Sequence, residues 1–139
     1  MPEATFCMVK PDGVARGLSS EIIKRVSNSG LKVIESRYER MPLGDARRLY
    51  KVHEGKSFYE GLVKFITGGD VLLMKLEGDN AVAALRGIMG ATDPREAEKG
   101  TIRGDLKEEN IFNQDKIMKN IIHGSDSREN ADYELSIFF

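Results

Sequence analysis

Short apolar segments with strand character alternate along this chain with segments whose apolar residues recur at helical spacing. The strand-like segments are residues 5–9, 31–39, 71–76 and 120–123. The helical spacing is found in residues 22–26, 43–50, 58–66, 82–89 and 131–138. The resulting order is strand, helix, strand, helices, strand, helix, strand, helix. It predicts βαββαβ units, in which an antiparallel sheet carries helices on one face, so we expect an α/β (α+β) fold.

Side chains that can cap a helix precede two of the predicted helices. Asn80 or Asp79 is placed to cap the helix that follows the third strand. Asp126 together with Glu129 resembles a capping box for the last helix. By contrast, residues 91–105 contain glycine, proline and charged residues without a clear period. We expect a functional loop there.

The length of 139 residues fits a single domain with a buried core, and we treat residues 1–139 as one domain because no repeat or linker interrupts them. The 21 basic and 22 acidic residues leave a formal net charge of -1. This balance argues against a protein that wraps nucleic acid through bulk charge, so a nucleic-acid partner is not expected. A small anionic ligand remains compatible, because it needs only a local basic pocket.

The single cysteine, Cys7, excludes internal disulfides and cysteine-rich zinc sites, and it fits a reducing compartment. No apolar run approaches the roughly 20 residues that a membrane-spanning helix needs. The first residues do not read as a signal peptide. We therefore expect a cytoplasmic protein that does not enter a membrane.

Several well-known motifs are incomplete in this chain. Gly55, Lys56 and Ser57 match the end of a Walker A loop, but Tyr50 stands where that pattern requires its first glycine. The patterns G-x-G-x-x-G and G-x-S-x-G are absent, and so is a cluster of zinc ligands. P-loop, dinucleotide, serine-hydrolase and metallohydrolase functions are therefore excluded, and no residue is predicted to ligate a metal directly.

His123 is the strongest candidate for covalent chemistry. It follows two β-forming residues and precedes Gly124 and a predicted helix, so it should lie at the end of a strand. A histidine with an ordinary pKa near 6.5 is mostly neutral in the cell, and its ring nitrogen can then attack phosphorus. A purely structural histidine is the alternative that the local pattern leaves open. His53 lies in a charged helical stretch and is interpreted as a surface residue.

Three cations and two aromatic residues are candidates for binding a phosphorylated ligand. Lys10, Arg86 and Arg103 lie where strands or helices end or loops begin. Each of them alone is also compatible with a solvated surface charge. Phe58 and Tyr50 can stack on a base or pack beneath one, and core packing is the alternative for both.

Four blocks of residues closely resemble the nucleoside diphosphate kinase family. They are KPDGVARGL at 10–18, MGAT at 89–92, GTIRGD at 100–105 and NIIHGSDS at 120–127. The resemblance implies a ferredoxin-like βαββαβ core with a four-stranded antiparallel sheet, assembled as a hexamer or a tetramer. It also implies reversible transfer of a γ-phosphoryl group from a nucleoside triphosphate to a nucleoside diphosphate. The transfer would proceed by a ping-pong mechanism through a phosphohistidine, with Mg²⁺ bound to the nucleotide.

The resemblance assigns catalytic roles to five positions. His123 matches the nucleophile, while Ser125 and Glu134 match the pair that orients its imidazole. Lys10 and Arg103 match residues near the transferred phosphate. A fixed carboxylate behind the ring is physically sensible, because it keeps the imidazole in one tautomer and supports the positive charge of the phosphorylated ring.

The resemblance also assigns nucleotide-binding roles. Phe58 matches the residue that stacks on the base, and Tyr50 matches an aromatic residue that supports the site. Arg86 and Thr92 match phosphate ligands, and Asn120 matches a polar contact to the sugar. The same alignment places Asp126 where a carboxylate would touch magnesium through water.

The chain departs from the family pattern at several positions. Ser57, Asp70 and Lys99 stand where the family usually has proline. The segment of residues 106–119 has more residues than the corresponding segment of typical members. We expect this longer segment to reshape the mouth of the pocket or a contact between subunits.

Two other functions on the same scaffold fit the sequence less well. A catalytically idle nucleotide-binding module would not need the attacking nitrogen of His123 or its orienting partners. A single-stranded nucleic-acid binder would need aromatic pairs on adjacent strands, which this sequence lacks.

Overall fold

The computed structural model describes residues 2–139 and contains one four-stranded antiparallel sheet of order β2-β3-β1-β4. The strands are β1 (Glu3–Val9), β2 (Lys32–Arg40), β3 (Asp70–Gly78) and β4 (Ile122–Gly124). The helices are α1 (Pro11–Ala15), α2 (Ser19–Asn28), α3 (Leu43–Leu49), α4 (Tyr59–Ile66), α5 (Ala81–Met89), α6 (Ile102–Leu106) and α7 (Arg128–Phe138), with a 3₁₀ turn η1 (Lys51–His53). This arrangement confirms the predicted α+β fold of the ferredoxin-like βαββαβ type.

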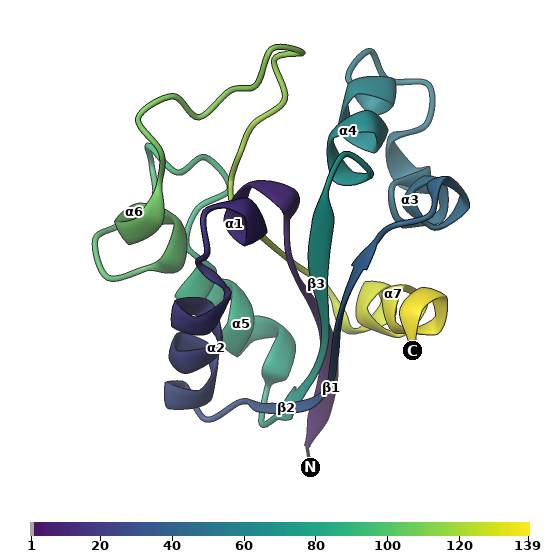
Figure 1. Cartoon of the computed structure of the whole chain (residues 1–139). Coiled ribbons are helices and arrows are strands. Elements are labelled where there is room, and N and C mark those ends of the chain that lie inside the picture. Colours follow the sequence, from purple (N-terminus) through teal and green to yellow (C-terminus); the bar gives the residue numbers. More distant parts are fainter. Residues whose placement is uncertain (1) are drawn as a thin grey trace.

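Helices cover both faces of the sheet, whereas the sequence pattern led us to expect them on one face. Figure 1 shows α2 and α5 on one side of the strands and α3, α4 and α7 on the other. The central strand β1 explains this arrangement, because its residues 5–9 are all buried. Cys7 and Val9 enter the core beneath α2 and α5, while Phe6 and Met8 enter the core beneath α3, α4 and α7. A strand buried on both faces reads as a continuous apolar run rather than an alternation.

Two helix caps differ from the sequence prediction. The N-cap of α7 is Ser127, whose Oγ accepts a hydrogen bond from the amide of Asn130 at 3.0 Å, so the predicted capping box is wrong. At α5 the N-cap Asn80 has a left-handed φ of 50° and makes no side-chain cap. The carboxylate of Glu3 instead accepts a hydrogen bond from the amide of Val82 at 2.9 Å. The first turn of α5 is therefore capped by the side chain of Glu3 on β1 rather than by its own N-cap residue.

The segment expected to be a loop at residues 91–105 contains the start of the short helix α6. The longer segment that follows it folds back on itself. Phe112 and Met118 form an isolated antiparallel bridge, and the side-chain oxygen of Asn113 accepts hydrogen bonds from two amides of the same turn. Ile117 packs against Gly61 of α4, where an added Cβ would lie 3.1 Å from Ile117. The longer segment therefore spans from α6 to α4 (Figure 1).

The strand β2 forms one edge of the sheet and pairs only with β3 among the described residues. Most of its residues are exposed, including Ile34 and Tyr38, which is 57% exposed. Among residues 2–139, no helix is both long enough and apolar enough to cross a membrane.

Candidate active site

A cleft of about 430 Å³ brings together every predicted site residue except Phe58 and Ser125. It is lined by the ends of β1 and β4 and by residues of α3, η1, α5, α6 and α7. The predicted residues that line it are Lys10, Tyr50, Arg86, Thr92, Arg103, Asn120, His123 and Glu134. Lys10 and His123 come from opposite ends of the chain and meet because β1 and β4 are neighbours in the sheet.

His123 is held at the strand end by contacts on two sides. It pairs with Met8 across the β1–β4 ladder, and its ring lies 5.7 Å from the ring of Phe6. Its Nε2 lies 2.8 Å from Oε1 of Glu134, and the hydroxyl of Ser125 donates to the same oxygen at 2.7 Å. A carboxylate at this distance accepts the Nε2 proton and fixes that tautomer. The lone pair of the ring is then on Nδ1, which makes no hydrogen bond within residues 2–139.

Arg103 is almost completely buried at the inner wall of the cleft. Its guanidinium donates to three backbone carbonyls, those of Asn120 at 3.1 Å, Gly90 at 3.2 Å and Ile122 at 2.6 Å. Burial and the nearby charge of Arg86 lower the pKa of Arg103 to about 10, so it remains charged at neutral pH. A guanidinium has more donors than these three bonds use, so some remain for an anionic ligand.

Lys10 contributes a second buried cation. Its Nζ donates to Oδ1 of Asn120 at 2.8 Å, and the amide nitrogen of Asn120 donates to the carbonyl of Thr92 at 3.0 Å. Burial is the main reason, and the charge of Arg103 the second, why the pKa of Lys10 is lowered to about 8. An anion bound between these cations would relieve their repulsion and replace the water that they have lost.

Asp12 shapes the site, although sequence reasoning did not single it out. Its Oδ2 accepts a hydrogen bond from the amide of Ile121 at 2.9 Å, and the carbonyl of Ile121 accepts one from the amide of Lys10 at 2.8 Å. Ile121 has a φ of 75°, an unfavourable left-handed conformation for a β-branched residue. Asp12 therefore helps to hold the strained turn that directs Asn120 and His123 into the cleft. Its position within the block KPDGVARGL at residues 10–18 is the sequence signal that could have identified it.

Tyr50 and His53 line another part of the cleft wall. Tyr50 is buried, and its hydroxyl has no hydrogen-bond partner within residues 2–139, while burial raises its pKa. His53 was expected on the surface but is half-buried and lines the cleft, because η1 turns it inward. Burial, and secondarily the charge of Lys56, lower the pKa of His53.

Phe58 lies outside the main cleft and is 43% exposed. Its ring makes an edge contact with the ring of His53 at 5.2 Å, so it lies directly beside the cleft wall. It lines a neighbouring recess of about 430 Å³ together with Gly61, Lys64 and Ile117. The longer segment of the chain therefore supplies the wall that faces Phe58.

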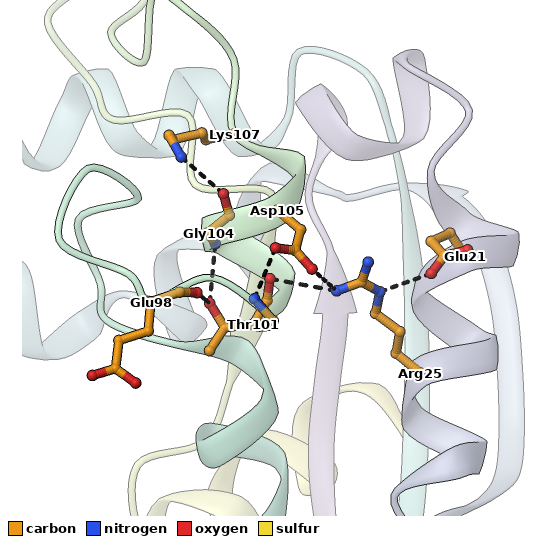
Figure 2. Close-up of polar contacts among 8 residues, drawn as sticks. Glu21, Arg25, Glu98, Thr101, Gly104, Asp105 and Lys107 are labelled. Carbon is orange, nitrogen blue, oxygen red and sulfur yellow. Dashed lines mark hydrogen bonds and ion pairs between the residues drawn. The ribbon is translucent and has the colours of Figure 1, made fainter.

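The helix α6 that carries Arg103 is secured by polar contacts on its outer side. Figure 2 shows Asp105 between the backbone of the preceding turn and Arg25 of α2. The hydroxyl of Thr101 accepts from the amide of Gly104 at 3.1 Å and donates to the carbonyl of Glu98 at 2.6 Å. These bonds cap a helix of only five residues.

The donor set of the cleft suits a magnesium ion that arrives with a phosphorylated ligand. Within residues 2–139 no three histidine, cysteine, aspartate or glutamate side chains form a metal-binding group. Asp126 lines the cleft, with one carboxylate oxygen accepting a hydrogen bond from the side-chain amide of Asn130, whereas the carboxylate of Glu134 is engaged by both Ser125 and His123. Magnesium bound by one carboxylate together with phosphate oxygens and water fits this arrangement.

Comparisons with known proteins point to one family. The family model described as nucleoside diphosphate kinase matches residues 3–139. A nucleoside diphosphate kinase of Saccharolobus solfataricus is 46% identical over 137 residues, which cover 99% of this chain and 94% of the relative. One of Sulfurisphaera tokodaii is 47% identical over 99% of this chain and 88% of its own length. The solved structure of a halophilic nucleoside diphosphate kinase from Halobacterium salinarum in complex with CDP has a TM-score of 0.90 and 42% identity, and covers 100% of this chain and 88% of that chain.

The lowered pKa of Lys10 predicts how anion binding depends on pH. Lys10 is charged at neutral pH and loses its proton as the pH rises through about 8. The affinity for inorganic pyrophosphate, measured by calorimetry, should therefore fall several-fold between about pH 7 and pH 9, which is the range over which this proton is lost. Lys10→Arg is the control, because a guanidinium stays charged throughout this range and the probe's own titration is common to both proteins. Equal pH dependence in the two proteins would contradict the assignment.

Proposed function

Because the chain belongs to the nucleoside diphosphate kinase family and is therefore a phosphotransferase, we propose that it moves the γ-phosphoryl group of a nucleoside triphosphate onto a nucleoside diphosphate through a phosphohistidine at His123. The observation that carries this proposal is the contact between Nε2 of His123 and Glu134. It leaves Nδ1 as the nucleophilic nitrogen in a cleft that Lys10 and Arg103 also line.

The first half-reaction is an in-line displacement at the γ-phosphorus. The lone pair of Nδ1 forms the N–P bond while the bond from phosphorus to the bridging oxygen breaks, and its electron pair leaves with the nucleoside diphosphate. The second half-reaction reverses these steps on a different diphosphate. Donor and acceptor therefore use one cleft in turn, which gives ping-pong kinetics.

Glu134 and Ser125 support the nucleophile without touching phosphate. The ring gains positive charge when Nδ1 becomes bonded to phosphorus, and the carboxylate of Glu134 at Nε2 stabilises that charge. The hydroxyl of Ser125, which is fully buried, holds the carboxylate in place. Orientation of the ring is thereby fixed before the nucleotide arrives.

Cations of the cleft stabilise the charge on the transferred group. Arg103 and Lys10 are held in place by hydrogen bonds to backbone and amide oxygens, so they need little reorganisation during the reaction. Arg86 and Thr92 lie at the exposed side of the cleft, where they would bind the remaining phosphates. When bound, Mg²⁺ would neutralise further phosphate charge, with Asp126 as the protein carboxylate nearest to it.

The nucleoside would occupy the outer part of the site. Asn120 would contact the sugar, Tyr50 would support the site from below, and the base would stack on Phe58 in the recess that Ile117 faces. Stacking favours every base because each has a π face, so broad tolerance of bases is expected. The relative from Halobacterium salinarum was solved with CDP, a pyrimidine diphosphate.

We further propose that the protein acts as a single 1–139 domain in a cytoplasmic homo-oligomer, either hexamer or tetramer. The support for assembly is the exposed edge strand β2, which presents unpaired backbone groups together with Ile34 and Tyr38. The free, buried thiol of Cys7 is compatible with the reducing cytoplasm.

The idle-module alternative is not favoured. An inactive module would have no use for a histidine whose Nε2 is held by a carboxylate that a buried serine supports. Nor do the described strands support single-stranded nucleic-acid binding, because both faces of the sheet are covered by helices.

Labelling with a nucleoside triphosphate tests the function. Mixed with magnesium and [γ-³²P]ATP but no acceptor, the protein should take up one phosphoryl group per chain in an acid-labile, alkali-stable linkage. Addition of the diphosphates of adenosine, guanosine, cytidine or uridine should discharge the label at comparable rates. His123→Ala should take up no label, because no neighbouring side chain replaces the nucleophile.

His53→Ala is the matched control, since His53 also lines the cleft and this variant should still be labelled. Labelling of the His123→Ala protein, or transfer that requires both nucleotides at once, would refute the phosphohistidine and favour the idle module.

Sedimentation velocity tests the assembly. Tyr38→Glu places a charge on the exposed edge strand and should shift the protein toward smaller species. Val52→Glu is the control, because Val52 is an exposed apolar residue of η1, outside the sheet. A monomeric wild-type protein would contradict the proposed assembly.

A further inference from the structure

Arg103 depends on a helix that is too short to be stable alone. The helix α6 has five residues, and isolated helices of that length do not persist in water. The three carbonyls that hold the guanidinium fix its position only while the backbone of α6 stays seated. Whatever holds α6 therefore also determines where this cation points.

Arg25 of α2 reaches across to α6 from outside the cleft. Its Nη1 donates to Oδ2 of Asp105 at 2.8 Å and to the carbonyl of Thr101 at 3.4 Å. The other oxygen of Asp105 accepts from the amide of Gly100 at 2.8 Å. Arg25 thus contacts both ends of the short helix, and Figure 2 shows it between Asp105 and Glu21.

Asp105 and Arg103 leave α6 in different directions. Two residues apart on a helix, they lie on roughly opposite sides of it. Asp105 faces α2 through Arg25, while Arg103 faces the carbonyls at the cleft. The helix is therefore held from both sides, and a loss of the outer contact would let the inner side chain move.

We propose that Arg25 is a positioning residue for phosphoryl transfer, acting through Asp105 to hold Arg103. This inference rests on the proposed function. Arg25 and Asp105 are partly exposed, so their ion pair adds little to the stability of the fold. A small displacement of Arg103, by contrast, lowers the rate, because transition-state charge is stabilised only by groups already in position.

Kinetics of two substitutions in the same ion-pair network test the proposal. Arg25→Gln removes the contact to α6, whereas Glu21→Gln changes only the side of Arg25 that faces away from α6. We expect kcat to fall about ten-fold in Arg25→Gln with KM little changed, and to stay near the wild-type value in Glu21→Gln. Urea unfolding should give similar stability for both variants. An equal loss of kcat in both, or a loss only in stability, would overturn the proposal.

A double substitution tests whether Arg25 acts through Arg103. In an Arg103→Ala background, Arg25→Gln should cause no further loss of the residual rate, because the group that it positions is gone. Full additivity of the two losses would show that Arg25 acts elsewhere and would overturn the inference.

A measurement without activity separates this proposal from the proposed function. The Nε–H signal of Arg103 can be assigned in ¹⁵N spectra as the signal lost in Arg103→Lys. Its hydrogen exchange with water should be slow in the wild-type and Glu21→Gln proteins and faster in Arg25→Gln. That pattern supports positioning by Arg25 even if no phosphoryl transfer is found, whereas unchanged exchange in Arg25→Gln overturns it.

Discussion

The contact between the carboxylate of Glu134 and Nε2 of His123 is the interaction on which the chemistry of this fold depends. It requires α7 to lie against the sheet face to which His123 points, and the stacked rings of Phe6 and Phe138 hold it there at 4.9 Å. It also requires the carboxylate to keep its place, which the buried hydroxyl of Ser125 ensures. Packing of one helix on the central strand thus decides which nitrogen of the imidazole is nucleophilic.

The cationic half of the site depends on the turns that flank β1 and β4. Asp12 holds the amide of Ile121, and the carbonyl of Ile121 in turn accepts from the amide of Lys10. These two hydrogen bonds bring the end of β1 to the start of β4, and the side chains of Lys10 and Asn120 meet there. The backbone carbonyls of Asn120, just before β4, and Ile122, at its start, accept hydrogen bonds from the guanidinium of Arg103. Backbone carbonyls and the side-chain amide of Asn120, rather than opposing carboxylates, hold the cations, so their charge remains available to phosphate.

The fold and most of the cleft could be predicted from the sequence, because strand and helix periods and the four residue blocks are local signals. The short helices around Pro11 and Ile102 were not predicted, since helices of five residues depend on caps and tertiary contacts more than on periodicity. The inward position of His53 arises from a 3₁₀ turn that no pattern marks. Asp12 was missed because its partner, the amide of Ile121, lies more than a hundred residues away. The recess beside Phe58 depends on Asp115 and Ile117, whose placement arises from turn hydrogen bonds to Asn113 rather than from a helix or strand period.

Identification of the phosphorylated nitrogen tests the central claim most directly. After labelling of ¹⁵N-histidine protein with a nucleoside triphosphate and magnesium, the coupling between ³¹P and ¹⁵N shows which ring nitrogen carries the phosphoryl group. Glu134 holds Nε2, so the account predicts phosphorus on Nδ1 of His123, with the proton retained on Nε2. Phosphorus on Nε2 would mean that the contact with Glu134 is broken during the reaction, and it would contradict the account.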